Sequence, residues 1–290
     1  MAYNSPSHKF GQIIGTLVEE VVISYLMPVA EHYSLFLDYN KPRKARNMKK
    51  DVRWTDINNN VHKLDIVMEK GGDENKIGSP CVFIEIAWRR YTKHSRNKAQ
   101  EISGALKPLI EKYKCFAPFF GFIVIGVFTQ AAIEQMKSEG FEVALISREI
   151  IERSFDVVGI NASWEESAKP DVLQKKVDSF NLLSQYDVEK IKKELLKHLQ
   201  VHLADFRAKL CEALERTVYT VRVTPVFGSA SEFSSNQEAC EFIAKMDEIS
   251  GSSEFIRLEI CVRYSNGDRI EAEYAVKDKA IAFLESISRL

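Results

Sequence analysis

The chain has 290 residues, of which 45% are hydrophobic and 28% charged, and its formal net charge is −1. This composition is ordinary for a globular protein with a sizeable core, and the length allows about two domains. It excludes a strongly basic or acidic chain, so any preference for a polyanion must come from local clusters.

The cysteines and the apolar runs argue against several further classes. The five cysteines are scattered, odd in number and without a CxxC pair, which disfavours a zinc ribbon or a disulfide scaffold. The N-terminal stretch is polar, which predicts no signal peptide. The longest apolar run, residues 116–128, is shorter than the ~20 residues of a membrane span. We therefore expect a cytoplasmic protein without a membrane segment.

The first predicted element is an amphipathic helix at residues 10–27, and its apolar face consists of Ile14, Leu17, Val18, Val21 and Tyr25. Glu19 and Glu20 lie at the edge of this face. Two roles are open for them: they belong to a solvated flank of the helix, or one of them leans toward a metal.

A basic segment follows at residues 41–53, with seven Lys or Arg residues and one acid. Such a run is either a solvated loop or a phosphate-binding segment. Because it lies just before the acidic strands described next, Arg43 and Lys44 are candidate nucleic-acid contacts.

Residues 52–57 and 61–68 are predicted to form a hairpin around Asn58–Asn60, because asparagine tolerates the left-handed conformation of tight turns. A polar loop at residues 70–80 leads to the run CVFIEIAW, residues 81–88. This run is nearly continuous in apolar residues, which is typical of a central buried strand.

The remainder of the first half alternates helix and strand. The pattern predicts a helix from Ser95 to Tyr113, a strand at 119–128, a helix at 129–140, a strand at 141–147 and a short helix at 148–155. This alternation predicts parallel strands joined by helical crossovers. The fold class is therefore α/β for residues 1–165.

The second half is predicted to contain a linker and long helix at 166–216 and a small α+β module at 217–290. The apolar stripe of the 187–216 helix serves either core packing or a dimer seam, and core packing is the default. His198 and His202 have metal-ligand spacing but lack an HExxH motif, which disfavours zinc. Asn266-Gly267 predicts a hairpin turn in the module.

Asp65 and Glu85 each lie inside an apolar run, where an acid is costly unless something cationic pairs with it. Hydrolysis of a phosphodiester needs a metal that polarises the phosphoryl oxygen and activates water. Magnesium binds hard oxygen ligands and keeps several waters. The two carboxylates and the backbone carbonyl of Ile86 form a suitable set.

These features resemble the PD-(D/E)xK nuclease superfamily, in which a hairpin with Asp is followed by an apolar strand with Glu and then by a basic helix. The resemblance covers roughly residues 8–155 and implies a restriction-endonuclease-like core. It implies that Asp65 and Glu85 bind Mg²⁺, with Mn²⁺ as an alternative, and that Glu19 or Glu20 assists.

The sequence departs from that family at Ala87, where the family has a lysine two positions after the Glu. Lys98 is the first candidate for the missing group, followed by Lys63 and Lys93. The segment WRRYTKHSRNK, residues 88–98, interleaves six basic or potentially basic residues with Trp88 and Tyr91. Such a mixture is typical of nucleic-acid contact, and the DNA-contact candidates in it are Arg89, Arg90, Lys93 and Arg96.

The resulting hypothesis is a Mg²⁺-dependent DNA endonuclease of a restriction or anti-phage defence type, acting as a homodimer because one centre cuts one strand. The alternative hypothesis is a degenerate nuclease fold that binds DNA or a partner without cleavage, as Ala87 favours. A nucleotide-dependent α/β enzyme is disfavoured because no GxGxxG or GxxxxGK[ST] follows a strand.

Overall fold

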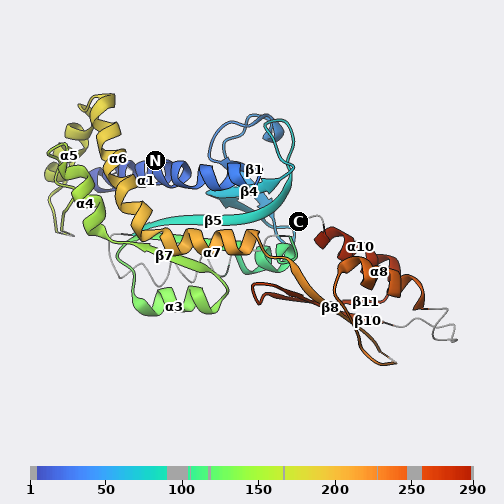
Figure 1. Cartoon of the computed structure of the whole chain (residues 1–290). Coiled ribbons are helices and arrows are strands. Elements are labelled where there is room, and N and C mark those ends of the chain that lie inside the picture. Colours follow the sequence, from blue (N-terminus) through green and yellow to red (C-terminus); the bar gives the residue numbers. More distant parts are fainter. Residues whose placement is uncertain are drawn as a thin grey trace. The chain divides into compact units, whose positions relative to one another are not determined.

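The computed structural model describes residues 5–89, 104, 106–116, 119–165, 167–226, 228–246 and 257–288. It divides the chain into two compact units (Figure 1). The first comprises Met1–Glu111 and Phe119–Lys209, and the second comprises Lys112–Pro118 and Leu210–Leu290.

The first unit is built on a mixed five-stranded sheet with the order β1-β4-β5-β6-β7. The strands are β1 (Leu35–Tyr39), β4 (Ile66–Lys70), β5 (Ser79–Arg89), β6 (Phe119–Gly126) and β7 (Glu142–Ile146). β1–β4 and β4–β5 pair antiparallel, whereas β5–β6 and β6–β7 pair parallel. This confirms the predicted α/β class and the parallel crossovers. The edge strand β1 was not predicted.

The centre of this sheet excludes water on both faces, as the apolar run of β6 requires, since every residue of β6 is buried. Gly121 in β6 allows a ring to approach the backbone closely. A Cβ added there would lie 2.5 Å from Phe206 Cζ and 3.0 Å from Ile84 Cγ1. Only glycine leaves room for Phe206 against the sheet.

Helix α1 (Pro6–His32) is the core helix of this unit and packs against β1, β5, α5 (Pro170–Asn181) and α6 (Gln185–His202) (Figure 1). The Ser5 hydroxyl caps it by accepting a hydrogen bond from the His8 N–H at 3.3 Å. By length and composition alone, α1 is long and apolar enough to cross a membrane, a test that the buried core helix of a soluble protein also passes. Eleven of its residues are buried in the fold.

Two further helices form where the sequence predicted them, and the first of them is the crossover between β6 and β7. α3 (Gln130–Ser138) begins after Thr129, whose hydroxyl accepts a hydrogen bond from the Ala132 N–H at 3.2 Å. α4 (Arg148–Asp156) follows β7. Of the helix predicted from Ser95 to Tyr113, residues 95–103 and 105 lie outside the described residues, and the remainder is helical.

The hairpin predicted at 52–68 forms, but its second strand is shorter than expected. β2 (Val52–Thr55) and β3 (Val61–Leu64) make a separate two-stranded sheet. The chain then bends at Asp65 and continues as β4 in the main sheet. The prediction of one strand over 61–68 is wrong because its two halves pair with different partners.

The region 166–216 is also more structured than predicted. α5 (Pro170–Asn181) begins with Pro170 in the first turn, where proline needs no partner for its nitrogen. The long helix is two helices, α6 (Gln185–His202) and α7 (Ala204–Leu214), separated at Leu203. α5 and α6 pack on α1 and therefore belong to the first unit rather than to a linker.

The second unit is a four-stranded antiparallel sheet, ordered β11-β10-β8-β9, with α8 and α10 packed against it. Its elements are β8 (Val218–Pro225), β9 (Ser231–Phe233), α8 (Asn236–Ala244), β10 (Leu258–Tyr264), β11 (Arg269–Tyr274) and α10 (Lys277–Ser288). Gly267 has φ +89°, which confirms the predicted turn. The open face carries mixed charges that pair with one another, such as Arg257 with Glu273 at 3.2 Å.

Candidate functional site

Asp65 and Glu85 meet at the point where the chain passes from β3 into β4. Ile66 pairs with Ile84, so Asp65 lies opposite Glu85. The Ile86 N–H donates to Asp65 Oδ2 at 2.7 Å, and the Asp65 N–H donates to Glu85 Oε1 at 3.3 Å. The structure therefore brings together the two carboxylates and the backbone segment that the sequence predicted.

The bend at Asp65 explains why this carboxylate turns toward β5. The ladder between β4 and β5 ends at Ile66, so it offers no backbone partner to the Ile86 N–H. A half-buried N–H without a partner is costly. The Asp65 carboxylate takes the place of the missing carbonyl, and this bond fixes its orientation beside Glu85.

Glu19 on α1 adds a third carboxyl to this region. Burial, together with the negative charges of Asp65 and Glu20, raises the pKa of Glu19 to about 7. Glu20 is instead exposed and forms an ion pair with Lys192 on α6 at 2.9 Å. Of the two acids that the sequence left open, Glu19 is thus the one whose pKa is raised in part by the charge of Asp65.

The atoms available to a metal here are the oxygen atoms of carboxylates and of a backbone carbonyl. Such hard ligands fit magnesium better than zinc. Within the described ranges, no group of three or more His, Cys, Asp or Glu side chains is close enough to hold one ion. Any ion here would rest on Asp65, Glu85 and the Ile86 carbonyl, with water completing its coordination. Magnesium accepts such a sparse protein shell.

The burial of Arg43 contradicts the prediction that this residue contacts nucleic acid. Its side chain is fully buried, 0% exposed, and lies 2.8 Å from Asp38 and 2.7 Å from Glu69. It also donates to the carbonyls of Asp73 and Lys76, at 2.7 Å each. The guanidinium therefore stabilises the fold. Lys44, the next residue, is exposed and stays a candidate contact.

The remaining basic candidates are only partly described. Lys98, Arg90, Lys93 and Arg96 lie outside the described residues. Arg89 ends β5, but only its backbone belongs to the described part of the chain.

Lys63, the second candidate for the missing lysine, is exposed and forms an ion pair with Asp51 at 3.0 Å. Its ammonium group therefore lies on the outer face of the hairpin, at an exposed ion pair. Ala87 is 4% exposed, so the position where the resembled family has its lysine holds a buried methyl group.

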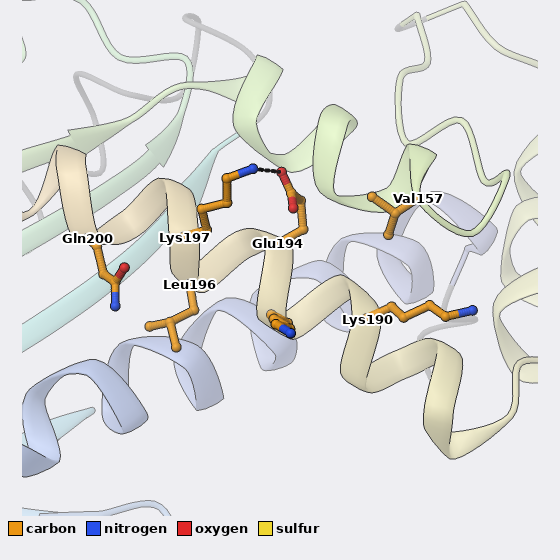
Figure 2. Close-up of a pocket in the computed structure, with 7 residues that line it drawn as sticks. Val157, Lys190, Glu194, Leu196, Lys197 and Gln200 are labelled. Atoms are coloured by element: carbon orange, nitrogen blue, oxygen red, sulfur yellow. Dashed lines mark hydrogen bonds and ion pairs between the residues drawn. The ribbon is translucent and has the colours of Figure 1, made fainter.

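A pocket of about 490 Å³ lies elsewhere in the first unit, along α6 and against Val157 (Figure 2). Three of its seven lining residues are exposed lysines, of which Lys197 pairs with Glu194 at 3.3 Å. None of the three site carboxyls lines it. His198 Nε2 also lies 3.2 Å from the Glu194 carboxylate.

No protein-family model, curated protein or solved structure matches this chain.

The Glu19→Gln variant should be more stable than the wild type at pH 8 and equally stable at pH 4. Between the ordinary pKa of 4.5 and the folded pKa of about 7, the folded chain binds more protons than the unfolded chain. Stability therefore falls as pH rises through this window. Glutamine carries no charge to bury, so we expect a gain of about 1–3 kcal/mol, reduced by partial exposure.

Urea unfolding in EDTA at both pH values measures this difference. Glu20→Gln is the matched control, because Glu20 is exposed on the same helix and its loss should change stability by less than ~1 kcal/mol at either pH. A gain for Glu19→Gln of the same size at pH 4 and pH 8 would show that this carboxyl titrates normally.

Proposed function

We propose that this chain is a Mg²⁺-dependent endonuclease that hydrolyses DNA phosphodiester bonds. The observation that carries the proposal is the meeting of Asp65 and Glu85 beside the backbone of Ile86, held by the hydrogen bond from the Ile86 N–H to Asp65 at 2.7 Å. The pKa of Glu19 is raised first by burial and then by the negative charges of Asp65 and Glu20, which accumulate near the same place. A divalent cation beside a phosphate would relieve that accumulation.

The surrounding elements support a restriction-endonuclease-like core. In the resembled family the order of elements is a helix, an antiparallel strand pair, the strand with Glu, a helix and a parallel strand. The chain follows this order with α1, the β1–β4 pair, β5, the helical residues 106–113 and β6. The antiparallel pair of the main sheet is β1–β4, and β2–β3 is an insertion between its strands.

Asp65, Glu85 and the Ile86 carbonyl would hold the metal, which when bound polarises the phosphoryl oxygen and makes a coordinated water more acidic. The Ile86 N–H keeps the Asp65 carboxylate oriented toward Glu85. Glu19, with a pKa of about 7, is able to accept or release a proton at neutral pH. We propose Lys98 as the group that stabilises charge at the phosphate.

Ala87 supports the alternative, a nuclease-like fold that binds DNA or a partner without cutting. Its buried methyl group offers no hydrogen-bond donor to the phosphate. Without a lysine from another position, the metal alone would have to stabilise the developing charge.

Incubation of the purified chain with supercoiled plasmid distinguishes the two functions. We expect nicked and linear products with Mg²⁺ or Mn²⁺ and none with EDTA. DNA binding without cleavage, across varied and modified substrates, would favour the degenerate fold.

Lys98→Ala should lower the cleavage rate by about 10²-fold or more while changing DNA affinity only a few-fold, because a charge-stabilising group acts mainly in the transition state. Single-turnover cleavage and fluorescence anisotropy measure the two quantities. Lys107→Ala is the matched control, since Lys107 is an exposed lysine that pairs with Glu139 at 3.5 Å. Equal losses of rate and affinity for Lys98→Ala would make Lys98 a phosphate contact only.

We further propose a restriction or anti-phage role, a homodimer that cuts both strands, and a cytoplasmic location. All five cysteines are free thiols, which fits a reducing compartment. Sedimentation with and without DNA tests the dimer.

A further inference from the structure

The β2–β3 hairpin has an inner face that packs and an outer face that does not. On the inner face, Val52 and Leu64 are buried, and the Trp54 ring meets Phe83 of β5 edge-on at 5.7 Å. An isolated two-stranded sheet is marginally stable in water. The packing of the inner face therefore stabilises the hairpin, and the side chains of the outer face contribute little to its stability.

The turn of the hairpin is held rigidly. Asp56 is 1% exposed, and its carboxylate accepts hydrogen bonds from the N–H groups of Asn58 and Asn60 at 2.8 and 2.9 Å. His62 Nε2 lies 2.8 Å from the same carboxylate. Burial alone would raise the pKa of Asp56, but these bonds lower it to about 2. The carboxylate stays charged near neutral pH and keeps the turn in one conformation.

The rigid tip presents apolar side chains to solvent. Ile57 is 55% exposed and Val61 is 60% exposed. The Ile57 N–H donates to the Pro108 carbonyl at 3.4 Å, which anchors the tip from the other side. Single exposed apolar residues are common. Two of them on a preorganised tip form a small contact surface that loses little entropy on binding.

The outer face is also basic. Arg53 and Lys63 are exposed and share one carboxylate, that of Asp51, at 2.8 and 3.0 Å. Lys49 and Lys50 are exposed just before β2. Arg53 and Lys63 therefore outnumber the one carboxylate that they share, and Lys49 and Lys50 add two exposed cations just before the strand. Such a surplus is complementary to the phosphates of a nucleic acid.

The position of the hairpin links it to the candidate site, because Lys63 is two residues before Asp65. We infer that the outer face of the β2–β3 hairpin is a docking surface for double-stranded DNA, with Arg53 and Lys63 on phosphates and Ile57 and Val61 against bases in a groove. A two-stranded ribbon fits the major groove. This inference rests on the proposed function and gives the DNA its path to Asp65 and Glu85.

The test uses the full chain carrying Asp65→Asn, so that binding to a duplex is measured without cleavage. Loss of Arg53 and Lys63, in the variant Arg53→Gln/Lys63→Gln, should reduce the slope of log affinity against log salt by about two, one per phosphate contact. Loss of the apolar tip, in Ile57→Ser/Val61→Ser, should weaken binding at least ~10-fold with an unchanged slope, because apolar contacts release no counterions.

Val172→Ser/Leu182→Ser is the matched control, since these exposed apolar residues lie on and just after α5 and should not affect affinity. The conservative variant Ile57→Leu keeps an apolar side chain at the tip. If it binds the duplex as tightly as the parent chain, the loss in the serine variant reflects a lost contact rather than altered folding. Wild-type affinity in the tip variant overturns the inference, and so does a parent chain that binds no duplex or binds RNA alone. Binding that depends on the hairpin without Mg²⁺-dependent cleavage supports the inference and overturns the nuclease proposal.

Discussion

Asp65→Asn should abolish Mg²⁺-dependent DNA cleavage, with a rate loss of at least ~10³-fold, which corresponds to about 4 kcal/mol of transition-state stabilisation. The amide matches the carboxylate in size, and its oxygen can still accept the hydrogen bond that Ile86 donates at 2.7 Å. What it lacks is the negative charge that a divalent cation requires. Glu85→Gln should behave alike, because it faces the same ion position.

Single-turnover cleavage at saturating DNA measures the rate, and calorimetric titration with Mg²⁺ measures the loss of metal affinity. Glu142→Gln is the matched control, since Glu142 is a carboxylate at the start of β7 that pairs with the surface Lys209 at 2.6 Å. Cleavage that persists in both Asp65→Asn and Glu85→Gln would rule out this pair as the metal centre. Loss of Mg²⁺ binding without any wild-type cleavage would instead describe a metal-binding but degenerate fold.

The sequence was sufficient to pair Asp65 with Glu85, because an acid within an apolar strand is rare enough to stand out. It was not sufficient to reveal the bend at Asp65. An alternating pattern continues across residues 61–68 whether one strand or two occupy them, and the choice is made by partners in β2 and β5. The choice between Glu19 and Glu20 likewise depended on which side of α1 meets Asp65 and which meets Lys192.

Arg43 illustrates a limit of a different kind. It stands in a run of seven basic residues, and composition alone treats all seven as surface charge. Its acidic partners Asp38 and Glu69 come from two strands, β1 and β4, that meet only in the folded sheet. The burial of a charge is set by such distant partners, and no local pattern reports it.

Arg43→Met should therefore destabilise the first unit by about 3–5 kcal/mol, because it removes the buried guanidinium that pairs with the carboxylates of Glu69 and Asp38, and of these two Asp38 still has Arg46 at 2.9 Å. The thioether also cannot donate to the carbonyls of Asp73 and Lys76, so the loop before β5 loses these hydrogen bonds. Lys44→Met is the matched control, since Lys44 is exposed and its loss should cost less than ~0.5 kcal/mol. Urea unfolding compares the two.

The same pair of variants separates folding from DNA contact. Arg43→Met should bind DNA with the affinity of the wild type once the folded fraction is taken into account. Loss of an arginine that contacts a phosphate would instead reduce the slope of log affinity against log salt by about one. Arg43→Lys should recover only part of the stability, because an ammonium group cannot reproduce the two bonds to Glu69 at 2.7 and 3.0 Å. A stable Arg43→Met protein with weakened DNA binding would indicate that Arg43 contacts nucleic acid and would contradict its burial.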